Sequence, residues 1–301
     1  MVRLFTLFVF PIITVGIFCI LFPATAIGDI TEVDDLKREI NLPVPAKRFV
    51  SLAPNITELL FHIGAGGNIV GADEFSNYPD EAKRITRVNN HALVNYELIL
   101  SLQPDLVFAW SSGNGYEIVQ RLRKLGLTVF VVEVTKLSQI PKLLKKLGRL
   151  TDKTSESNRV AASFYKKLQS LIELHKNKKK VKTFYQIWDD PIMTLNGEHL
   201  ISDVIKICGG VNIFATSTPL VPRVNIETIM KFDPEVILSS GAQERLVSWK
   251  KSWSRWKNIT AVKSGHLYLI PPDLLQRPTN RTLDGADYMC KYLDQYRAFG
   301  S

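Results

Sequence analysis

The longest segment with a helical spacing of hydrophobic positions runs from Thr151 to Lys182. Its apolar residues recur three and four positions apart, at Val160, Phe164, Leu168, Leu171 and Ile172. Neither proline nor glycine interrupts it. Thr154 or Ser155 is expected to cap its start, and lysines between positions 176 and 182 suit the C-terminal end of a helix dipole. We therefore predict one long helix, with 151–180 as a stiff connection between two lobes.

The segments on either side of this helix resemble each other. Glu97–Trp110 reads ELILSLQPDLVFAW, and Glu227–Ser240, which begins 130 residues later, reads ETIMKFDPEVILSS. Each begins with glutamate, has the pattern of a short amphipathic helix, turns at a proline and continues as an apolar strand. Two further pairs recur in the same order, 58–70 with 203–214 and 126–132 with 265–271. Three ordered blocks favour an internal repeat over coincidence.

The repeat predicts two similar lobes, at 45–150 and 181–298, each with alternating strands and helices. That alternation is typical of an α/β fold with mainly parallel sheets. Besides the strands that end the repeated blocks, we expect strands at 48–53, 69–73, 127–133, 182–188 and 266–270. A glycine-rich turn is predicted at Ser111–Gly115. The tryptophan stripe at positions 249, 253 and 256 has helical spacing and is interpreted as core.

The first 26 residues combine one early basic residue, Arg3, with a long apolar run that ends in Ala24-Thr25-Ala26. Small residues in this A-x-A arrangement are typical of a secretory cleavage site. We therefore predict a signal peptide over 1–26, cleaved near Ala26, and an exported mature chain. The length of the apolar run leaves an uncleaved membrane anchor as the alternative.

Without Cys19, which lies in that segment, the mature chain has two cysteines, Cys208 and Cys290. A lone pair in an exported protein usually forms a disulfide, although two buried free thiols are the alternative. Neither cysteine lies in a C-x-x-C motif or at a metal spacing from histidine. The sequence therefore predicts a disulfide and no metal site.

Composition permits a core in each lobe, with 46% hydrophobic and 22% charged residues. The net charge of +9 is compatible with a nucleic acid or an anionic membrane as partner. However, the only dense basic cluster, 176–182, contains no aromatic residues, so we interpret it as a solvated helix end. We expect a monomer that binds no nucleic acid.

Ligands of parallel sheets bind beyond the carboxyl ends of the strands. The residues that follow predicted strands, or lie in loops at that edge, combine aromatic side chains with a few polar groups, as suits a bulky ligand with an apolar body and polar edges. They are Pro54, Asn55, Phe75, His91, Trp110 and Asn114 in the first lobe and Trp188, Asp189, Val221, Asp273 and Arg277 in the second. For Asp273 and Arg277, a structural ion pair is the alternative.

The motifs of common hydrolases and phosphate-binding proteins are missing. The sequence contains no G-x-S-x-G, no H-E-x-x-H and no phosphate-binding loop. We therefore expect a binding protein. An exported enzyme that acts on a large polar ligand in the same cleft is the alternative class, and formation of product would favour it.

Four segments carry a resemblance to a known family. RFVSLAPNITEL, FSNYPDEAKRI, LILSLQPDLVFAWSSGN and ICGGVNIF resemble segments of the periplasmic binding proteins of metal-chelate ABC importers, and among these the cobalamin-binding type. The resemblance covers nearly the whole mature chain. It implies the class III architecture, in which one rigid helix joins two lobes. It also implies that the helices carrying Cys208 and Cys290 are linked by a disulfide.

The resemblance further implies a ligand, a site and a partner. The ligand would be a corrinoid such as cobalamin, transported and not kept as a cofactor, with a ferric siderophore or haem as the alternative. Phe75, Trp110, Asp273 and Arg277 match ligand side chains, and Pro54 and Asn55 contribute backbone. Phe75 replaces a usual tyrosine, and His91 and Val221 replace usual tryptophans. The partner would be a homodimeric inner-membrane permease with its ATPase, docked at Glu97 and Glu227, each of which alone would suit a helix N-terminus.

Overall fold

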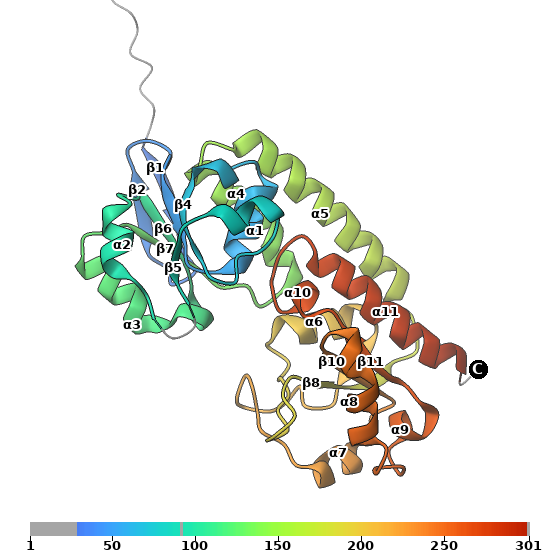
Figure 1. Cartoon of the computed structure of the whole chain (residues 1–301). Helices are drawn as coiled ribbons and strands as arrows, with labels where there is room; N and C mark the ends of the chain where they lie inside the picture. Colours follow the sequence, from blue (N-terminus) through green and yellow to red (C-terminus); the bar gives the residue numbers. More distant parts are fainter. Residues whose placement is uncertain (1–28, 91–92, 300–301) are drawn as a thin grey trace, which may run out of the picture.

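The computed structural model describes residues 29–90 and 93–299 as two lobes bridged by a long helix (Figure 1). The predicted signal peptide and His91 lie outside the described residues. The predicted α/β architecture, with parallel sheets in two similar lobes, is confirmed.

The first lobe has a five-stranded parallel sheet in the order β5-β4-β3-β6-β7. Its strands are β3 (Phe49–Ser51), β4 (Ile69–Asp73), β5 (Arg87–Asn89), β6 (Leu106–Trp110) and β7 (Val129–Val132). Helices pack on both faces, as the apolar strands require. They are α1 (Pro54–His62) and α4 (Ile140–Leu150) on one face and α2 (Tyr96–Ser101) and α3 (Ser111–Lys124) on the other.

The second lobe has a four-stranded parallel sheet in the order β11-β10-β8-β9. Its strands are β8 (Val181–Gln186), β9 (Gly210–Asn212), β10 (Val236–Ser240) and β11 (Leu267–Ile270). Its helices are α6 (Leu200–Ile207), α7 (Ile226–Phe232), α8 (Leu246–Trp253), α9 (Thr260–Ser264), α10 (Pro272–Leu275) and α11 (Thr282–Phe299).

The internal repeat is visible in both sheet order and local geometry. The order β4-β3-β6-β7 of the first lobe corresponds to β9-β8-β10-β11 of the second, and β5 is an additional edge strand. The main repeated block forms α2 and β6 in one lobe and α7 and β10 in the other. Each of these helices is capped by an asparagine, since Asn95 accepts from the Leu98 amide at 3.0 Å and Asn225 from the Thr228 amide at 2.9 Å.

The connecting helix, α5 (Thr154–His175), is shorter than predicted at both ends. Asp152 adopts a left-handed conformation with φ of 59°, which separates α5 from α4. Neither Thr154 nor Ser155 caps the helix, because Lys153 occupies that position and makes no side-chain cap. The basic run from 176 to 180 follows the helix, where the Lys178 ammonium contacts the Asp294 carboxylate at 2.6 Å.

Two other features differ from the sequence-based expectation. The predicted turn Ser111–Gly115 is the first turn of α3, with non-helical geometry only at Gly115, whose φ is 78°. An antiparallel hairpin of β1 (Ile30–Val33) and β2 (Glu39–Leu42) was not predicted. The Asp35 amide at its tip donates to the Val131 carbonyl at 2.9 Å, so the hairpin protects the open edge of β7.

One apolar cluster extends through both lobes and along α5. It includes Phe49 and Ile56 in the first lobe, Phe164 in α5, and Val181 and Leu293 in the second lobe. Separate clusters fill the outer faces of the two sheets, and Trp249 and Trp253 lie in that of the second lobe. Their interpretation as core is confirmed, although Trp256 lies beyond the end of α8.

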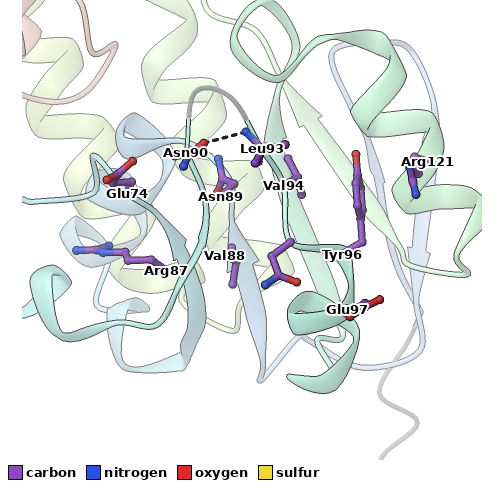
Figure 2. Close-up of a pocket in the computed structure, with 11 residues that line it drawn as sticks. Glu74, Arg87, Val88, Asn89, Asn90, Leu93, Val94, Tyr96, Glu97 and Arg121 are labelled. Carbon is purple, nitrogen blue, oxygen red and sulfur yellow. Dashed lines mark hydrogen bonds between the residues drawn. The ribbon is translucent and has the colours of Figure 1, made fainter.

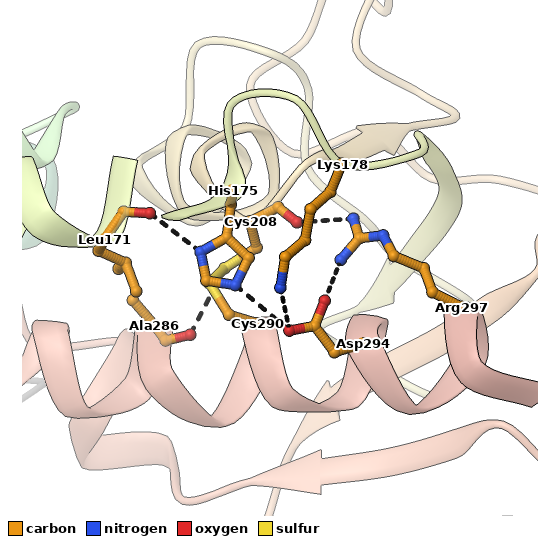
Figure 3. Close-up of a disulfide and its surroundings, with 8 residues drawn as sticks. All are labelled: Leu171, His175, Lys178, Cys208, Ala286, Cys290, Asp294 and Arg297. Atoms are coloured by element: carbon orange, nitrogen blue, oxygen red, sulfur yellow. Dashed lines mark hydrogen bonds and ion pairs between the residues drawn. A yellow bond between two sulfur atoms is a disulfide. The ribbon is translucent and has the colours of Figure 1, made fainter. Parts of the chain in front are cut away.

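The predicted disulfide between Cys208 and Cys290 is present, with a Cα–Cα distance of 4.7 Å (Figure 3). It joins the end of α6 to α11. Beside it, Asp294 of α11 accepts from Lys178 at 2.6 Å and from Arg297 at 2.5 Å, and its carboxylate lies 3.4 Å from the His175 imidazole at the end of α5. This group of contacts fixes the C-terminal end of α5 to the second lobe.

Candidate functional site

The carboxyl ends of strands from both lobes surround a pocket of about 420 Å³. Residues that follow β3 and β6 form one wall, and the segment after β11 forms the other, so that the pocket spans both lobes. Six of the residues predicted from sequence line it together, namely Pro54, Phe75, Trp110, Asn114, Asp273 and Arg277. Leu52, Phe75 and Trp110 contribute apolar side chains to this lining, which suits a ligand with an apolar body.

Trp110, the last residue of β6, has contacts through its backbone amide, its indole nitrogen and its ring. Its amide donates to the Asn114 side chain at 2.7 Å, and its indole nitrogen lies 3.4 Å from the Glu133 carboxylate. Asn114 in turn donates to the Leu52 carbonyl at 2.9 Å. Gly113 permits the ring to lie against the backbone, because a Cβ there would lie 2.1 Å from the Trp110 ring. The indole is therefore preorganised at the pocket wall.

Phe75 lies at the start of the loop after β4, is 48% exposed and lines the pocket. Asp73, at the end of β4, accepts from the Phe75 amide at 2.8 Å and from the Asn89 side chain at 2.8 Å. Burial raises the pKa of Asp73, against the effect of these hydrogen bonds. The Asp73 carboxylate thus ties the Phe75 loop to β5.

Asp273 and Arg277 lie in and just after α10, one helical turn apart, with nitrogen and oxygen 3.3 Å apart. Arg277 also donates to the Asn77 side chain of the first lobe at 2.7 Å. The two interpretations of this pair are therefore compatible, because the residues form an ion pair and also line the pocket.

A second hollow of about 630 Å³ adjoins the pocket, with Gln276 lining both. Trp188 and Asp189, which follow β8, line this second hollow. Trp188 is 62% exposed, and its indole donates to the Asp190 carbonyl at 3.0 Å. Asp189 pairs with Arg245 at 2.7 Å. The cleft surface therefore continues along the second lobe beyond the pocket.

The structure does not bring every predicted residue to the pocket. Asn55 is buried at the start of α1, and its side-chain amide finds no hydrogen-bond partner among the described residues. Val221 is half-buried and lines neither hollow. Sequence reasoning missed Gln276 and Asp73, although Gln276 lies between two predicted residues and Asp73 ends a predicted strand. A role for Asn55, Val221 or His91 remains a prediction.

Glu97 and Glu227 are both exposed, at the second position of α2 and of α7. Glu97 borders a hollow of about 630 Å³ on the first lobe, which Figure 2 shows together with Tyr96 and Arg121. Within the part of the chain that the structure describes, neither glutamate forms an ion pair. The capping asparagines leave both carboxylates free for other contacts.

Neither a candidate metal centre nor a candidate membrane-spanning helix is found in residues 29–90 and 93–299. No group of three or more histidine, cysteine, aspartate or glutamate side chains there could hold a metal ion. None of the helices described in these ranges is long and apolar enough to cross a membrane.

Comparison with known proteins adds sequence relatives. The profile of a family described as "Periplasmic binding protein" matches residues 49–274. The vitamin B12-binding protein of Vibrio cholerae serotype O1 is 36% identical over 252 residues, which cover 83% of this chain and 90% of that protein. The vitamin B12-binding protein of Yersinia pestis is 31% identical over 255 residues, which cover 84% and 89%.

Solved structures show the same fold. The periplasmic vitamin B12 binding protein BtuF of Vibrio cholerae superposes with a TM-score of 0.79 at 35% identity, covering 85% of this chain and 99% of that one. The periplasmic heme-binding protein RhuT from Roseiflexus sp. RS-1 has a TM-score of 0.71 at 20% identity, with 83% and 99% covered. At the lower identity the likeness concerns the fold alone.

Proposed function

This chain belongs to the periplasmic binding protein family, and we propose that it captures cobalamin between its lobes and delivers it to an ABC importer. The observation that carries the proposal is the pocket that both lobes line. Trp110 and Phe75 offer aromatic faces, and Asp273 and Arg277 offer charged groups on the opposite side. A corrinoid combines a large ring with amide and phosphate edges, which such a pocket complements. The vitamin B12-binding relatives support this choice of ligand.

The proposed place of action is the periplasm, after removal of a signal peptide near Ala26. The Vibrio cholerae relative BtuF is described as a periplasmic protein, which supports a periplasmic location for this chain. The disulfide supports it too, because disulfides persist in oxidising compartments. We expect the ligand to be released chemically unchanged, so prolonged incubation should yield no product.

Haem or a ferric siderophore is the second candidate ligand, since haem-binding proteins share this fold. Cobalamin is the preferred candidate, because the charged pair in the pocket would complement the amide and phosphate edges of a corrinoid. The test is to mix the purified protein separately with cobalamin, haem and a ferric hydroxamate, remove free ligand, and record the visible spectrum. We expect retention of cobalamin alone. Retention of haem or the ferric chelate without cobalamin would overturn the assignment.

We further propose that Glu97 and Glu227 dock the protein on the two halves of a homodimeric permease. Their equivalent positions in the repeat support this, as do the asparagines that already cap their helices. Carboxylates that face arginines would orient the complex and speed its formation. Changing both residues to alanine should leave ligand affinity intact and strongly reduce transport. Normal uptake by the double variant at normal expression would contradict this role.

A further inference from the structure

The short helices α2 and α7 present the same exposed features on the two lobes. Each buries its central isoleucine, since Ile99 and Ile229 are both 0% exposed. Three residues after the glutamate, each exposes a large apolar side chain, Leu100 at 39% and Met230 at 36%. Positions three apart lie on one face of a helix. Each lobe therefore presents a carboxylate beside an apolar side chain.

A hollow borders the start of each helix. On the first lobe, the hollow of about 630 Å³ is lined by Tyr96 and Glu97, and the Arg121 guanidinium lies 4.6 Å from the Tyr96 ring centre (Figure 2). On the second lobe, a hollow of about 410 Å³ is lined by Asn225 and Thr228 of the equivalent segment. The repeat thus places an exposed carboxylate and an exposed apolar side chain together on each lobe, and a hollow adjoins the start of each helix.

Packing in the core of either lobe does not account for the exposed side chains of Leu100 and Met230. A single exposed leucine or methionine is ordinary on a protein surface. The same exposure at equivalent positions, each beside a carboxylate without an ion pair among the described residues, is a repeated pattern. A partner with two equivalent halves can meet two such surfaces at once.

We infer that Leu100 and Met230 are the apolar anchors of a two-fold docking surface, on which each lobe receives an equivalent segment of a homodimeric partner. The chemistry defines that segment as a cationic side chain next to an apolar one. Burial of the apolar pair excludes water from the neighbouring ion pair and so strengthens it. The inference rests on the proposed function, in which the partner is the permease.

The test compares the double variant Leu100→Ser/Met230→Ser with Leu174→Ser as the matched control. Leu174 is 64% exposed on α5 and has no equivalent in the repeat. Two quantities are measured for each full-length mature protein: cobalamin affinity by calorimetry, and affinity for the cognate permease–ATPase complex in lipid nanodiscs. The melting temperature verifies folding.

We expect the double variant to dock at least about tenfold more weakly than wild type, as loss of buried anchors does at other interfaces. Its cobalamin affinity and melting temperature should match wild type, and the control should dock normally. The double variant could dock at wild-type strength while Glu97→Ala/Glu227→Ala docks weakly. That result would overturn the role of Leu100 and Met230 and leave the docking role of the two glutamates intact. If the wild-type protein binds no cobalamin or does not dock, the proposed function is overturned, and so is the proposed role of Leu100 and Met230.

Discussion

Glu58 of α1 and Arg281, which directly precedes α11, form a bidentate ion pair between the two lobes. The Arg281 nitrogens lie 2.7 and 2.6 Å from the two carboxylate oxygens. Thr279 also donates to Glu58 at 2.7 Å, and the Arg281 guanidinium lies 3.9 Å from the centre of the Tyr78 ring. Because the Glu58 side chain is only 4% exposed, this contact is a buried connection between lobes.

Removal of one partner should therefore be costly. Arg281→Met leaves the buried Glu58 carboxylate without its cation, and we expect a loss of about 3 kcal/mol in the free energy of unfolding. Urea denaturation measures it. Arg159→Met is the control, because its pair with Glu156 is exposed and should be worth less than about 1 kcal/mol. Equal losses in the two variants would show that the buried inter-lobe pair contributes no more to stability than an exposed pair does.

The same connection predicts little movement between the lobes. The continuous helix α5, the shared apolar cluster and the Glu58–Arg281 pair all oppose bending. We expect binding to rearrange loops and to close the lobes by only a few degrees. Small-angle scattering with and without saturating cobalamin should show no resolvable contraction. A clear decrease in the radius of gyration would contradict this expectation.

The disulfide should matter for stability more than for binding. It closes a separation of 82 residues, and loops of this size correspond to roughly 2–5 kcal/mol. Cys208→Ala/Cys290→Ala should lose about that amount in urea denaturation. Neither cysteine lines the pocket, so calorimetry should find an unchanged ligand affinity. An equally stable variant would mean that the disulfide is not a main constraint on the unfolded chain.

Asp294 provides a pH-dependent contribution to stability. Burial disfavours its charged form, but hydrogen bonds from Lys178 and Arg297 outweigh this and lower the pKa of Asp294 below its ordinary 3.8. A lowered pKa stabilises the folded state above that ordinary value, and the contribution is lost as pH falls through the folded-state pKa. Solvent screening at this partly exposed site limits the effect to about 1 kcal/mol.

Asp294→Asn should therefore lower the free energy of unfolding at pH 7 by about 1 kcal/mol. The difference from wild type should shrink as the pH falls below 3.8. Denaturation over a pH series measures it. Glu173→Gln, which removes an exposed pair with Lys176 near the end of α5, serves as the control and should change little. A constant difference at every pH would contradict an electrostatic origin.

The sequence predicts those features that depend on local pattern. Apolar runs bounded by proline and glycine predict the strands, and the repeated blocks predict the equivalent order of the two sheets. Contacts between distant residues left no such signal. Glu58 and Arg281 are 223 residues apart, and nothing in the helix pattern around Glu58 indicates its partner. The hairpin at Ile30–Val33 and Glu39–Leu42 was missed because each strand has only four residues, half of them polar.

The candidate site, too, was predictable from the sequence only in part. Trp110 ends a predicted strand, and Asp273 and Arg277 come after another, so their convergence was predictable from parallel topology. Their supporting contacts were not, because Glu133 and Asn77 reach them from separate segments. Resemblance to a family pointed to the candidate ligand residues, whereas only the three-dimensional structure reveals what holds them in place.

The central claim is that the pocket between the lobes holds cobalamin, and calorimetric titration of Trp110→Ala tests it most directly. Tyr165→Ala is the control, since Tyr165 is an exposed aromatic residue on α5. Wild type and control should bind one cobalamin with equal affinity. The Trp110 variant should bind at least about 2 kcal/mol more weakly, as loss of a buried aromatic anchor does at other interfaces. Equal affinities in all three proteins, or no binding by wild type, would contradict the account.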